Sequence, residues 1–228
     1  MTADGYAVEM QRGPASAFHG RAVPDPARPA LWVHEVDRPA LVLGSNQDES
    51  MVDVAACRRG GIEVVRRRSG GGAVLLVPGD AHWIDVVVPA TDPGWVADVH
   101  RQMEWVGEGM VDALVSTTGL DRARLAVHHG PMRRTAWSST ICFDGVGAGE
   151  VLLDGAKLVG ISQRRTRAFA RLQCSWYTAY RPAGLVELLV PGRRPPLGEL
   201  QPVAVLPADA TPVTAADVAA ALAPVLTR

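Results

Sequence analysis

The stretch that most constrains this chain is residues 63–77, which read EVVRRRSGGGAVLLV. An apolar strand enters a turn of arginines, one serine and three glycines, and a second apolar strand leaves it. Consecutive glycines let the backbone take positive φ and let a ligand approach main-chain N–H groups closely. Side-chain alternation predicts that Arg67 faces away from Arg66 and Arg68. The stretch predicts a site for a ligand with a phosphate or carboxylate group and an apolar body, or else a hairpin turn flanked by solvated arginines.

Length and composition exclude several classes of protein. The chain has 228 residues, of which 47% are hydrophobic and 21% charged, with a formal net charge of -1. These values are typical of a globular protein with a sizeable core. No basic excess indicates nucleic-acid binding, no apolar run approaches the roughly 18 residues of a membrane helix, and the N-terminus lacks the layout of a secretory signal. Three cysteines without a CxxC spacing indicate neither disulfides nor zinc. We therefore expect a cytoplasmic protein with no metal, no membrane contact and no nucleic-acid partner.

Lys157 is the only lysine in the sequence, because every other member of the 23 Lys plus Arg residues is an arginine. It stands between Gly155 and Gly160 in the segment GAKLVGISQ, among Leu and Val. A compact ammonium group differs from the planar fork of arginine, and Gly160 lets a ligand approach the strand. The position predicts a point charge aimed at a phosphate or acyl oxygen; a surface lysine that survived by chance is the alternative.

Cys142 is the third candidate for chemistry, between Ile141 and Phe143. A cysteine in such a context is usually a small buried hydrophobe. An ammonium group nearby would favour its thiolate form and make it a nucleophile. Cys57, on a predicted helix, and Cys174, in a predicted apolar strand, have less to recommend them.

Hydrophobic periodicity predicts an α+β chain, with strands dominating the centre and one long helix in the middle. Helices are predicted over residues 16–22, 51–59, 96–117, 182–190 and 214–226. Strands are predicted over 31–35, 40–43, the two arms of 63–77, 83–88, 125–128, 138–143, 150–153, 157–162 and 168–177. Residues 1–30 show weak periodicity, and 191–212 are predicted to be a long, poorly structured connection.

Three segments in order, RRRSGGGAV, ICF and GAKLVGISQRR, resemble the catalytic domain of the lipoate–protein ligase and octanoyltransferase superfamily, whose fold is shared with biotin–protein ligase. The resemblance covers about residues 40–177. It implies an α+β fold with a mixed central β-sheet flanked by helices, like class II synthetases. It also implies a single catalytic domain over 1–228, with its core at about 31–190, a linker and C-terminal helix at 191–228, and no accessory C-terminal ligase domain.

The resemblance implies transfer of a lipoyl or octanoyl group to a lysine of a small lipoyl carrier domain. Lys157 matches the lysine that holds the acyl carbonyl and phosphoryl oxygens, and an ammonium at a developing oxyanion in a dry tunnel is a large catalytic contribution. Arg67 matches an arginine that meets phosphate in the ligases. The remaining acyl- or nucleotide-binding positions would be Ser69, Gly70, Gly71, Gly72, Ala73, Val74, Leu75, Gly155, Gly160, Ser162 and Gln163.

The superfamily contains two chemistries. Ligases form an acyl-adenylate with ATP and Mg, whereas cysteine-dependent octanoyltransferases and amidotransferases form a thioester without ATP. Cys142 stands fifteen residues before Lys157 and is followed by Phe143, which is similar to the cysteine-dependent branch, and the Arg-Asn-Asp segment of many ligases is missing. We therefore expect Cys142 and Lys157 to be catalytic, with an acyl carrier protein or lipoyl carrier domain as partner. The alternatives are an ATP-dependent ligase and a non-catalytic acyl- or nucleotide-binding relative.

Two positions depart from the family pattern. The usual histidine–aspartate pair after GGGAV is replaced by Leu76 and Val77, and the common Gln-His-Gly is Gln173, Cys174 and Ser175. Both changes fall at the acyl pocket or the carrier approach. The identity of the acyl group, including biotinyl, therefore stays open at this stage.

Overall fold

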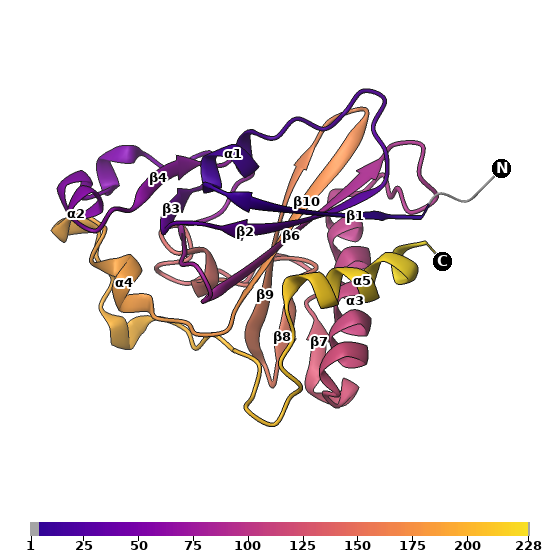
Figure 1. The fold of residues 1–228 in the computed structure, drawn as a ribbon. Coiled ribbons are helices and arrows are strands. Elements are labelled where there is room, and N and C mark those ends of the chain that lie inside the picture. Colours follow the sequence, from indigo (N-terminus) through magenta and orange to yellow (C-terminus); the bar gives the residue numbers. More distant parts are fainter. Residues whose placement is uncertain (1–4, 228) are drawn as a thin grey trace.

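The computed structural model describes residues 5–227 and contains two β-sheets with helices packed around them (Figure 1). The strands of the large sheet are β1 (Ala7–Gly13), β2 (Ala30–Val36), β6 (Ala81–Pro89), β7 (Leu125–Val127), β8 (Val151–Leu153), β9 (Ala156–Arg165) and β10 (Phe169–Tyr177). The strands of the small sheet are β3 (Ala40–Leu43), β4 (Glu63–Arg66) and β5 (Val74–Leu76). The helices are α1 (Ala15–Gly20), α2 (Val54–Arg59), α3 (Val99–Thr118), α4 (Pro182–Val186) and α5 (Ala215–Leu226). Short 3-10 helices are η1 (Glu49–Met51), η2 (Arg122–Arg124), η3 (Cys142–Asp144), η4 (Pro191–Arg193) and η5 (Leu197–Glu199).

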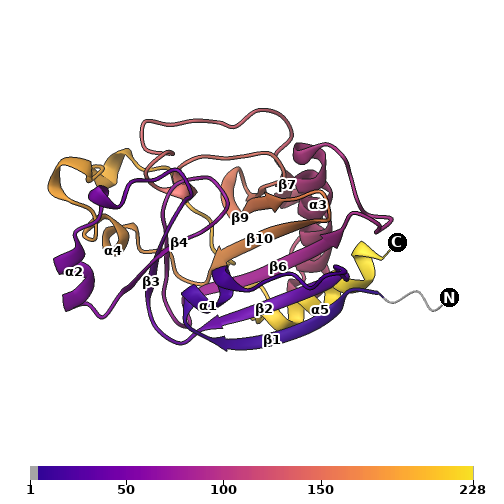
Figure 2. The same ribbon diagram turned by 90° about the horizontal axis from the view of Figure 1, so that it is seen from above.

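Both sheets are mixed. The large sheet has the order β1-β2-β6-β10-β9-β8-β7, in which β1 and β2 are parallel and the other neighbours antiparallel. The small sheet has the order β4-β3-β5. Helices α3 and α5 lie side by side on one face of the large sheet, and α2 and α4 lie at the far end of the molecule beside the small sheet (Figures 1 and 2). None of the helices within residues 5–227 has the length and apolar composition needed to cross a bilayer.

The main hydrophobic core lies between the large sheet and helices α3 and α5. On β10, Leu172, Cys174 and Trp176 point into this core together with Val106 and Met110 of α3. Because successive side chains of a strand point to opposite faces, the intervening β10 residues face away from the helices. The large sheet therefore presents a second, more polar face toward the small sheet.

The small sheet lies between two further hydrophobic cores, one on each of its faces. Val42 of β3 and Val74 of β5 face the large sheet, whereas Leu41 and Leu43 face α2 and α4. The polar face of the large sheet and the apolar face of the small sheet thus meet. Several of the predicted site residues, among them Arg67, Cys142 and Ser162, line the space between them.

The stretch at 63–77 is not a hairpin, although a hairpin was one of the two predictions. Strands β4 and β5 do not pair with each other; β3 lies between them, parallel to β4 and antiparallel to β5. The Arg–Gly turn therefore crosses the end of β3, which requires a wide turn. Arg67 is buried while Arg66 and Arg68 are exposed, as the side-chain alternation predicted.

The predicted strand at 138–143 is wrong. This segment contains turns and η3, and only Ile141 forms an isolated bridge, with Ala73. The side chain of Ser138 accepts a hydrogen bond from the Thr135 backbone N–H and donates one to the Thr135 carbonyl. Such local bonds satisfy the backbone in a turn and compete with strand pairing.

The connection at 191–212 is more ordered than predicted. It contains η4 and η5, and Val203 forms a parallel bridge with Lys157 on β9. The Ala204 N–H donates to the Lys157 carbonyl at 2.9 Å, and the Gln201 N–H donates to the Asp144 carboxylate at 2.7 Å. The connection therefore braces the strand that carries the only lysine.

Several predicted boundaries shift because of capping side chains. Asp98 accepts from the Arg101 N–H, so α3 begins at Val99 and not at residue 96. Asp53 accepts from the Ala56 N–H and separates α2 from η1. Strand β1 was not predicted at all, because its side chains are exposed on both faces and show no period of two.

Candidate active site

The Arg–Gly turn and the Cys142 segment meet through backbone pairing. The Ala73 N–H donates to the Thr140 carbonyl at 2.8 Å, and the Cys142 N–H donates to the Ala73 carbonyl at 3.0 Å. A Cβ on Gly72 would lie only 2.6 Å from the Cys142 nitrogen, and Gly71 has a φ of 100°, in the region that favours glycine. The glycines are therefore needed so that the two segments can approach this closely.

The Lys157 side chain points into this junction and is buried, with 2% of its surface exposed. Its Nζ donates to the carbonyl oxygens of Cys142 at 3.0 Å and Gly145 at 3.1 Å. It also pairs with Glu150 Oε1 at 2.7 Å and lies 4.7 Å from the centre of the Phe143 ring. The ammonium group thus has three acceptors for its three protons. To bind an acyl oxygen, it must release one of the two carbonyls.

Glu150 was not predicted as a site residue. Its Oε1 accepts from the Ile161 N–H at 3.2 Å as well as from Lys157, and its Oε2 accepts from the Gly147 N–H at 2.7 Å. A signal existed, because Glu150 begins the apolar segment EVLL on the far side of the Asp154-Gly155 hairpin turn from Lys157. Facing strands of a hairpin bring such residues together. Leu152 is the strand partner of Lys157, and a glutamate two residues before that partner is a candidate ion pair for the only lysine of a chain.

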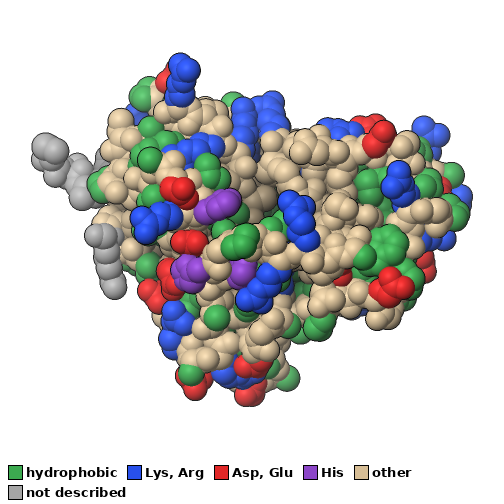
Figure 3. Space-filling view, turned by 180° about the vertical axis from the view of Figure 1, so that it is seen from behind, with side chains coloured by type: hydrophobic (Ala, Val, Ile, Leu, Met, Phe, Trp, Pro, Cys, Tyr) green, Lys and Arg blue, Asp and Glu red, His purple; other side chains and the backbone are tan. Residues whose placement is uncertain are grey.

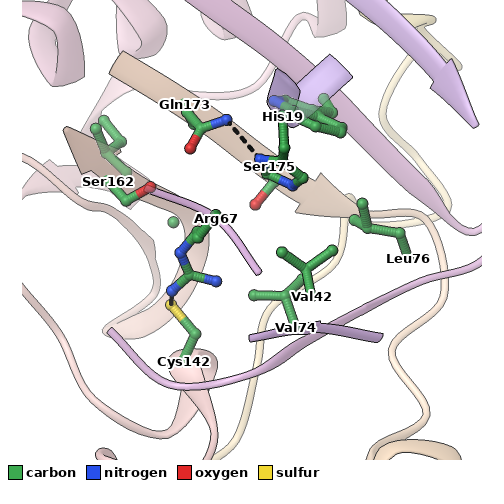
Figure 4. Close-up of a pocket in the computed structure, with 12 residues that line it drawn as sticks. His19, Val42, Arg67, Val74, Leu76, Cys142, Ser162, Gln173 and Ser175 are labelled. Atoms are coloured by element: carbon green, nitrogen blue, oxygen red, sulfur yellow. Dashed lines mark hydrogen bonds between the residues drawn. The ribbon is translucent and has the colours of Figure 1, made fainter. Parts of the chain in front are cut away.

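Arg67 lies on the other side of Cys142. Its Nη2 donates to the carbonyls of Gly70 and Gly72, both at 2.8 Å, and lies 3.9 Å from Cys142 Sγ (Figure 4). Its Nε donates to the Gly70 carbonyl at 3.2 Å. The guanidinium group is buried and forms no salt bridge with any carboxylate of residues 5–227. It holds the glycine turn and touches the cysteine sulfur.

Cys142 lines two cavities, one on each side of it. The inter-sheet cavity has an apolar wall of Val42, Val74 and Leu76 (Figure 4), and Trp83 of β6 also lines it. Its free volume is about 40 Å³, room for roughly three water molecules at 10–15 Å³ each. An acyl chain can therefore enter only if side chains of this wall move.

The opposite wall of the inter-sheet cavity is polar. Ser162 and Gln173 each bond to the Ser69 hydroxyl, at 3.0 and 3.1 Å, and the Gln173 amide lies 3.3 Å from His19 Nδ1. Ser175 completes this wall at the end away from Cys142. A continuous hydrogen-bond chain thus runs beside the cavity.

The second cavity, here called the lysine cavity, opens on the other side of Cys142. It is lined by Lys157, Glu150 and the glycine turn, together with Gln163 and Met132. On the molecular face opposite to that of Figure 1, basic side chains border a recess near the middle (Figure 3). Cys142 therefore lines both the cavity with the apolar wall and the cavity that contains the Lys157–Glu150 pair.

A buried ionic cluster fixes the far end of the inter-sheet cavity. Asp85 accepts from His34 Nε2 at 3.0 Å, from Trp83 Nε1 at 2.7 Å and from Arg171 Nε at 2.8 Å. Burial alone would raise the pKa of Asp85, but His34 and Arg171 outweigh it and hold that pKa well below its usual value. Arg171 also donates to the Phe18 carbonyl at 2.6 Å. The cluster therefore fastens α1 to the large sheet.

His19 is carried by α1 and packs against Trp83, with 4.5 Å between the ring centres. Burial lowers the pKa of His19 from 6.5 to about 3, so its imidazole is neutral at physiological pH. Its Nε2 is buried and has no hydrogen-bond partner in the described part of the chain. Sequence reasoning missed His19, because only the folded position of α1 brings it to the cavity.

The structure brings most of the predicted site residues around Cys142, but not all of them. The residues lining one or both cavities are Arg67, Gly70, Gly71, Gly72, Val74, Cys142, Lys157, Gly160, Ser162 and Gln163. Gly155 is an exposed turn residue whose φ of 86° the hairpin requires, and alternation on β5 turns Leu75 toward α4. Ala73 is engaged in the bridge to Ile141, and Ser69 reaches the polar wall through its hydroxyl. Gly155 and Leu75 therefore line neither cavity with a side chain, and their assignment to the site stays a prediction.

The sequence model described as the lipoyl protein ligase A/B catalytic domain matches residues 17–222. The chain belongs to this family. A curated member of similar sequence, octanoyltransferase LipM of Kyrpidia tusciae, is 36% identical over 142 residues, which cover 61% of this chain. The match spans only 50% of that relative's length. The resemblance to this superfamily is thus confirmed.

Solved structures show the same fold at low sequence identity. Lipoate-protein ligase A bound with ATP has a TM-score of 0.65 and 20% identity, over 96% of this chain and 82% of that one. The bipartite lipoate protein ligase of Thermoplasma acidophilum, described with its E2 lipoyl domain, has a TM-score of 0.64 and 18% identity, over 97% and 82%. Biotin protein ligase of Leishmania major with biotinyl-5-AMP has a TM-score of 0.53 and 10% identity, over 97% and 73%. The expected mixed α+β fold of lipoate and biotin ligases is confirmed.

The two departures from the lipoyl protein ligase pattern have different positions. Leu76 and Ser175 both line the inter-sheet cavity, one on its apolar wall and the other on its polar wall. Cys174 points into the core beneath the large sheet, and burial raises its pKa well above the usual value. Leu76 and Ser175 therefore change the walls of the inter-sheet cavity, whereas Cys174 does not reach it.

Proposed function

We propose that this chain transfers an octanoyl or lipoyl group to a lysine of a lipoyl carrier domain through a thioester on Cys142. The observation that carries the proposal is the position of Cys142, which lines both the inter-sheet cavity with its apolar wall and the cavity that contains Lys157. Membership of the lipoyl protein ligase A/B family and similarity to an octanoyltransferase support the reaction class. The acyl donor would be an acyl carrier protein.

The first half-reaction follows from the two chambers. The acyl chain lies between Val42 and Val74 on one side and β10 on the other, so that its carbonyl carbon is beside Cys142 Sγ. The Cys142 thiolate attacks this carbon, a new C–S bond forms, and the donor sulfur leaves and takes up a proton. The oxygen that becomes negative is stabilised by Lys157 Nζ after it releases a backbone carbonyl. Glu150 keeps the ammonium in place throughout.

The second half-reaction uses the lysine cavity. The amine of the acceptor lysine attacks the thioester carbon, the C–S bond to Cys142 breaks, and the amine loses a proton to solvent. An entering alkyl-amine stem would pass Met132 and Gln163, which line this cavity. The product is an amide on the carrier domain, and Cys142 returns to its thiolate.

An ATP-dependent ligase is the second candidate, and the Arg–Gly turn favours it. A buried guanidinium without a carboxylate partner suits a phosphate group, and glycines let phosphate oxygens approach the backbone. ATP and Mg²⁺ are needed only on this route, in which Arg67 would meet the phosphate. When bound, ATP would supply activation of the acyl carboxylate.

The experiment compares the routes in one assay. The full chain is incubated with octanoyl-loaded acyl carrier protein and an apo lipoyl domain, and the domain's mass is measured with and without ATP–Mg. We expect transfer without ATP that is lost in Cys142→Ser and kept in Cys57→Ala, a control at a buried cysteine on α2. Transfer from free octanoate that needs ATP and survives Cys142→Ser would replace the thioester route by the ligase route. Failure to transfer from either donor would contradict both and leave a binding-only relative.

A further inference from the structure

The positive charges of the site are not all paired with carboxylates, and Arg67 is the cation without a carboxylate partner among residues 5–227. Lys157 and Glu150 form a buried ion pair at 2.7 Å, so the charge of the lysine is already neutralised. Arg67 is 4% exposed, and among residues 5–227 its acceptors are the carbonyl oxygens of Gly70 and Gly72 and, at 3.9 Å, the Cys142 sulfur, but no carboxylate. A buried cation without a counter-ion is strongly disfavoured. An anion is therefore expected beside Arg67.

Cys142 Sγ is the ionisable atom placed to be that anion. It lies 3.9 Å from Arg67 Nη2, and Gly71 has no side chain to intervene: a Cβ there would lie 2.8 Å from Nη2 and 3.6 Å from Sγ. In Figure 4 the guanidinium group points at the sulfur. The contact is direct, whereas the charge of Lys157 is directed toward Glu150 and two carbonyls.

Other titratable groups near Arg67 do not supply the charge. Burial, with Tyr180 and Cys142 nearby, raises the pKa of Tyr177 well above its usual value, and its hydroxyl donates to the Leu75 carbonyl at 3.1 Å. Burial likewise raises the pKa of Tyr180. Both phenols are therefore neutral at physiological pH.

We propose that Arg67 is the counter-ion of the Cys142 thiolate, so that the activating cation is this arginine and not Lys157. The inference rests on the proposed role of Cys142 as nucleophile. The thiol gives its proton to water, the sulfur carries the negative charge beside the guanidinium group, and the charge is consumed when the C–S bond to the acyl group forms. When the acceptor amine displaces the sulfur, the thiolate returns to Arg67. Lys157 is then free to serve the acyl oxygen alone.

The shape of the guanidinium group explains why an arginine is needed here. One edge of the fork holds the Gly70 carbonyl through both Nε and Nη2, and Nη2 also reaches Gly72 and the sulfur. A lysine ammonium on a flexible stem cannot maintain all these contacts in one geometry. Arg67 therefore holds the glycine turn and at the same time stabilises the negative charge of the nucleophile.

The test is the rate at which iodoacetamide alkylates Cys142 at pH 7, with the site assigned by peptide mass. Cys57 and Cys174 are buried, so the native protein reports Cys142. We expect Arg67→Met to slow alkylation at least about tenfold, because the cation in direct contact with the sulfur is removed. Arg67→Lys should recover part of the rate. The matched control, Arg68→Met, removes the neighbouring exposed arginine and should leave the rate unchanged.

Two results would overturn the inference. The first is a folded Arg67→Met variant whose Cys142 is alkylated as fast as in the wild type. The second is a double variant, Lys157→Met with Glu150→Gln, in which the alkylation rate falls as much as in Arg67→Met although the net charge of the pair is unchanged. If Arg67→Met does not fold, a second measurement is used. It compares the ultraviolet absorbance of the thiolate in the wild type with that in Cys142→Ser at pH 7. A difference that shows a thiolate on Cys142 supports the inference, and no difference contradicts it. Alkylation needs no acyl donor, so this result and the transfer assay can fail independently.

Discussion

Two arginines of this protein are equally buried but differ in what surrounds them. Arg171 is 2% exposed, bonds to the carboxylate of Asp85 through Nε and Nη2, and donates to the carbonyls of Phe18 and Arg21. Arg67 is 4% exposed and has carbonyl acceptors and a cysteine sulfur, but no carboxylate among residues 5–227. One cation has a carboxylate as its counter-ion, and the other has only the Cys142 sulfur beside it.

This difference separates structure from chemistry. The Arg171 cluster satisfies its own charges and fastens α1 against the large sheet, so it contributes to the fold. Arg67 places a positive charge in the wall of the inter-sheet cavity beside Cys142, where an anion can form. Burial and charge alone do not distinguish the two; the presence of a counter-ion does.

The largest effect should distinguish the cysteines near the two arginines. We expect Cys142→Ala to lower octanoyl transfer by about a thousandfold or more, because the nucleophile is removed. Cys174 is on β10, like Arg171, and its side chain lies in the main core. Cys174→Ala should change the transfer rate less than about twofold and lower the unfolding free energy by about 1 kcal/mol. Steady-state transfer rates and urea unfolding measure both. Equal losses of transfer in the two variants would contradict the distinction between Cys142 and Cys174.

The second prediction removes the counter-ion of Arg171. Asp85→Asn leaves that buried cation uncompensated, so the unfolding free energy should fall by about 3–5 kcal/mol. The rate of Cys142 alkylation in the folded protein should stay unchanged, because this cluster does not charge the nucleophile. Chemical denaturation and the alkylation assay check the two halves. Wild-type stability would mean that the cluster is not what holds α1.

The third prediction concerns pH and His19, which α1 carries. Burial lowers its folded pKa from 6.5 to about 3, so the unfolded state gains the proton first as the pH falls. The stability is fully present above about pH 6.5 and is lost progressively between 6.5 and 3, amounting to about 2 kcal/mol between pH 6.5 and 5. His19→Asn should flatten this slope, and the exposed His100→Asn should not. Unfolding free energies across this pH range give the comparison, and identical slopes would refute the assignment to His19.

The smallest effect is expected for the stability of Arg67→Met. Loss of the bonds to the Gly70 and Gly72 carbonyls destabilises, whereas removal of an uncompensated buried charge stabilises. We expect the unfolding free energy to stay within about 1 kcal/mol of the wild type, in contrast to Asp85→Asn. Thermal and urea unfolding measure it. A loss as large as that of Asp85→Asn would make Arg67 a second structural arginine.

The helices and strands with a strong hydrophobic pattern could be predicted from the sequence. So could the meeting of the glycine turn, Cys142 and Lys157 in the fold. The period of β10 and the stripe of α3 follow from packing on one core, and they were predicted within a few residues. The order of the glycine turn, Cys142 and Lys157 carried the family resemblance. The edge strand β1 and the turns at 138–143 were missed, because exposed side chains and local hydroxyl bonds leave no periodic signal.

The charge partners within the site were harder to predict than the strands. The Asp154-Gly155 hairpin turn gave a signal for Glu150 near Lys157, but no residue pattern specified the register shift between Val151 and Leu152 that accompanies this pair. Asp85 and Arg171 come from strands far apart in the chain that become neighbours only in the folded sheet. Which arginine lacks a carboxylate is therefore a property of the fold, and it cannot be read from three arginines in a row.

The most direct test of the account is the intact mass of the chain itself after a short incubation with octanoyl-loaded acyl carrier protein, without ATP and without an acceptor domain. We predict one added octanoyl group, located on Cys142 by fragmentation and released by hydroxylamine as a thioester. An unmodified chain that nevertheless transfers octanoyl groups, or an adduct at any other residue, would contradict the thioester on Cys142.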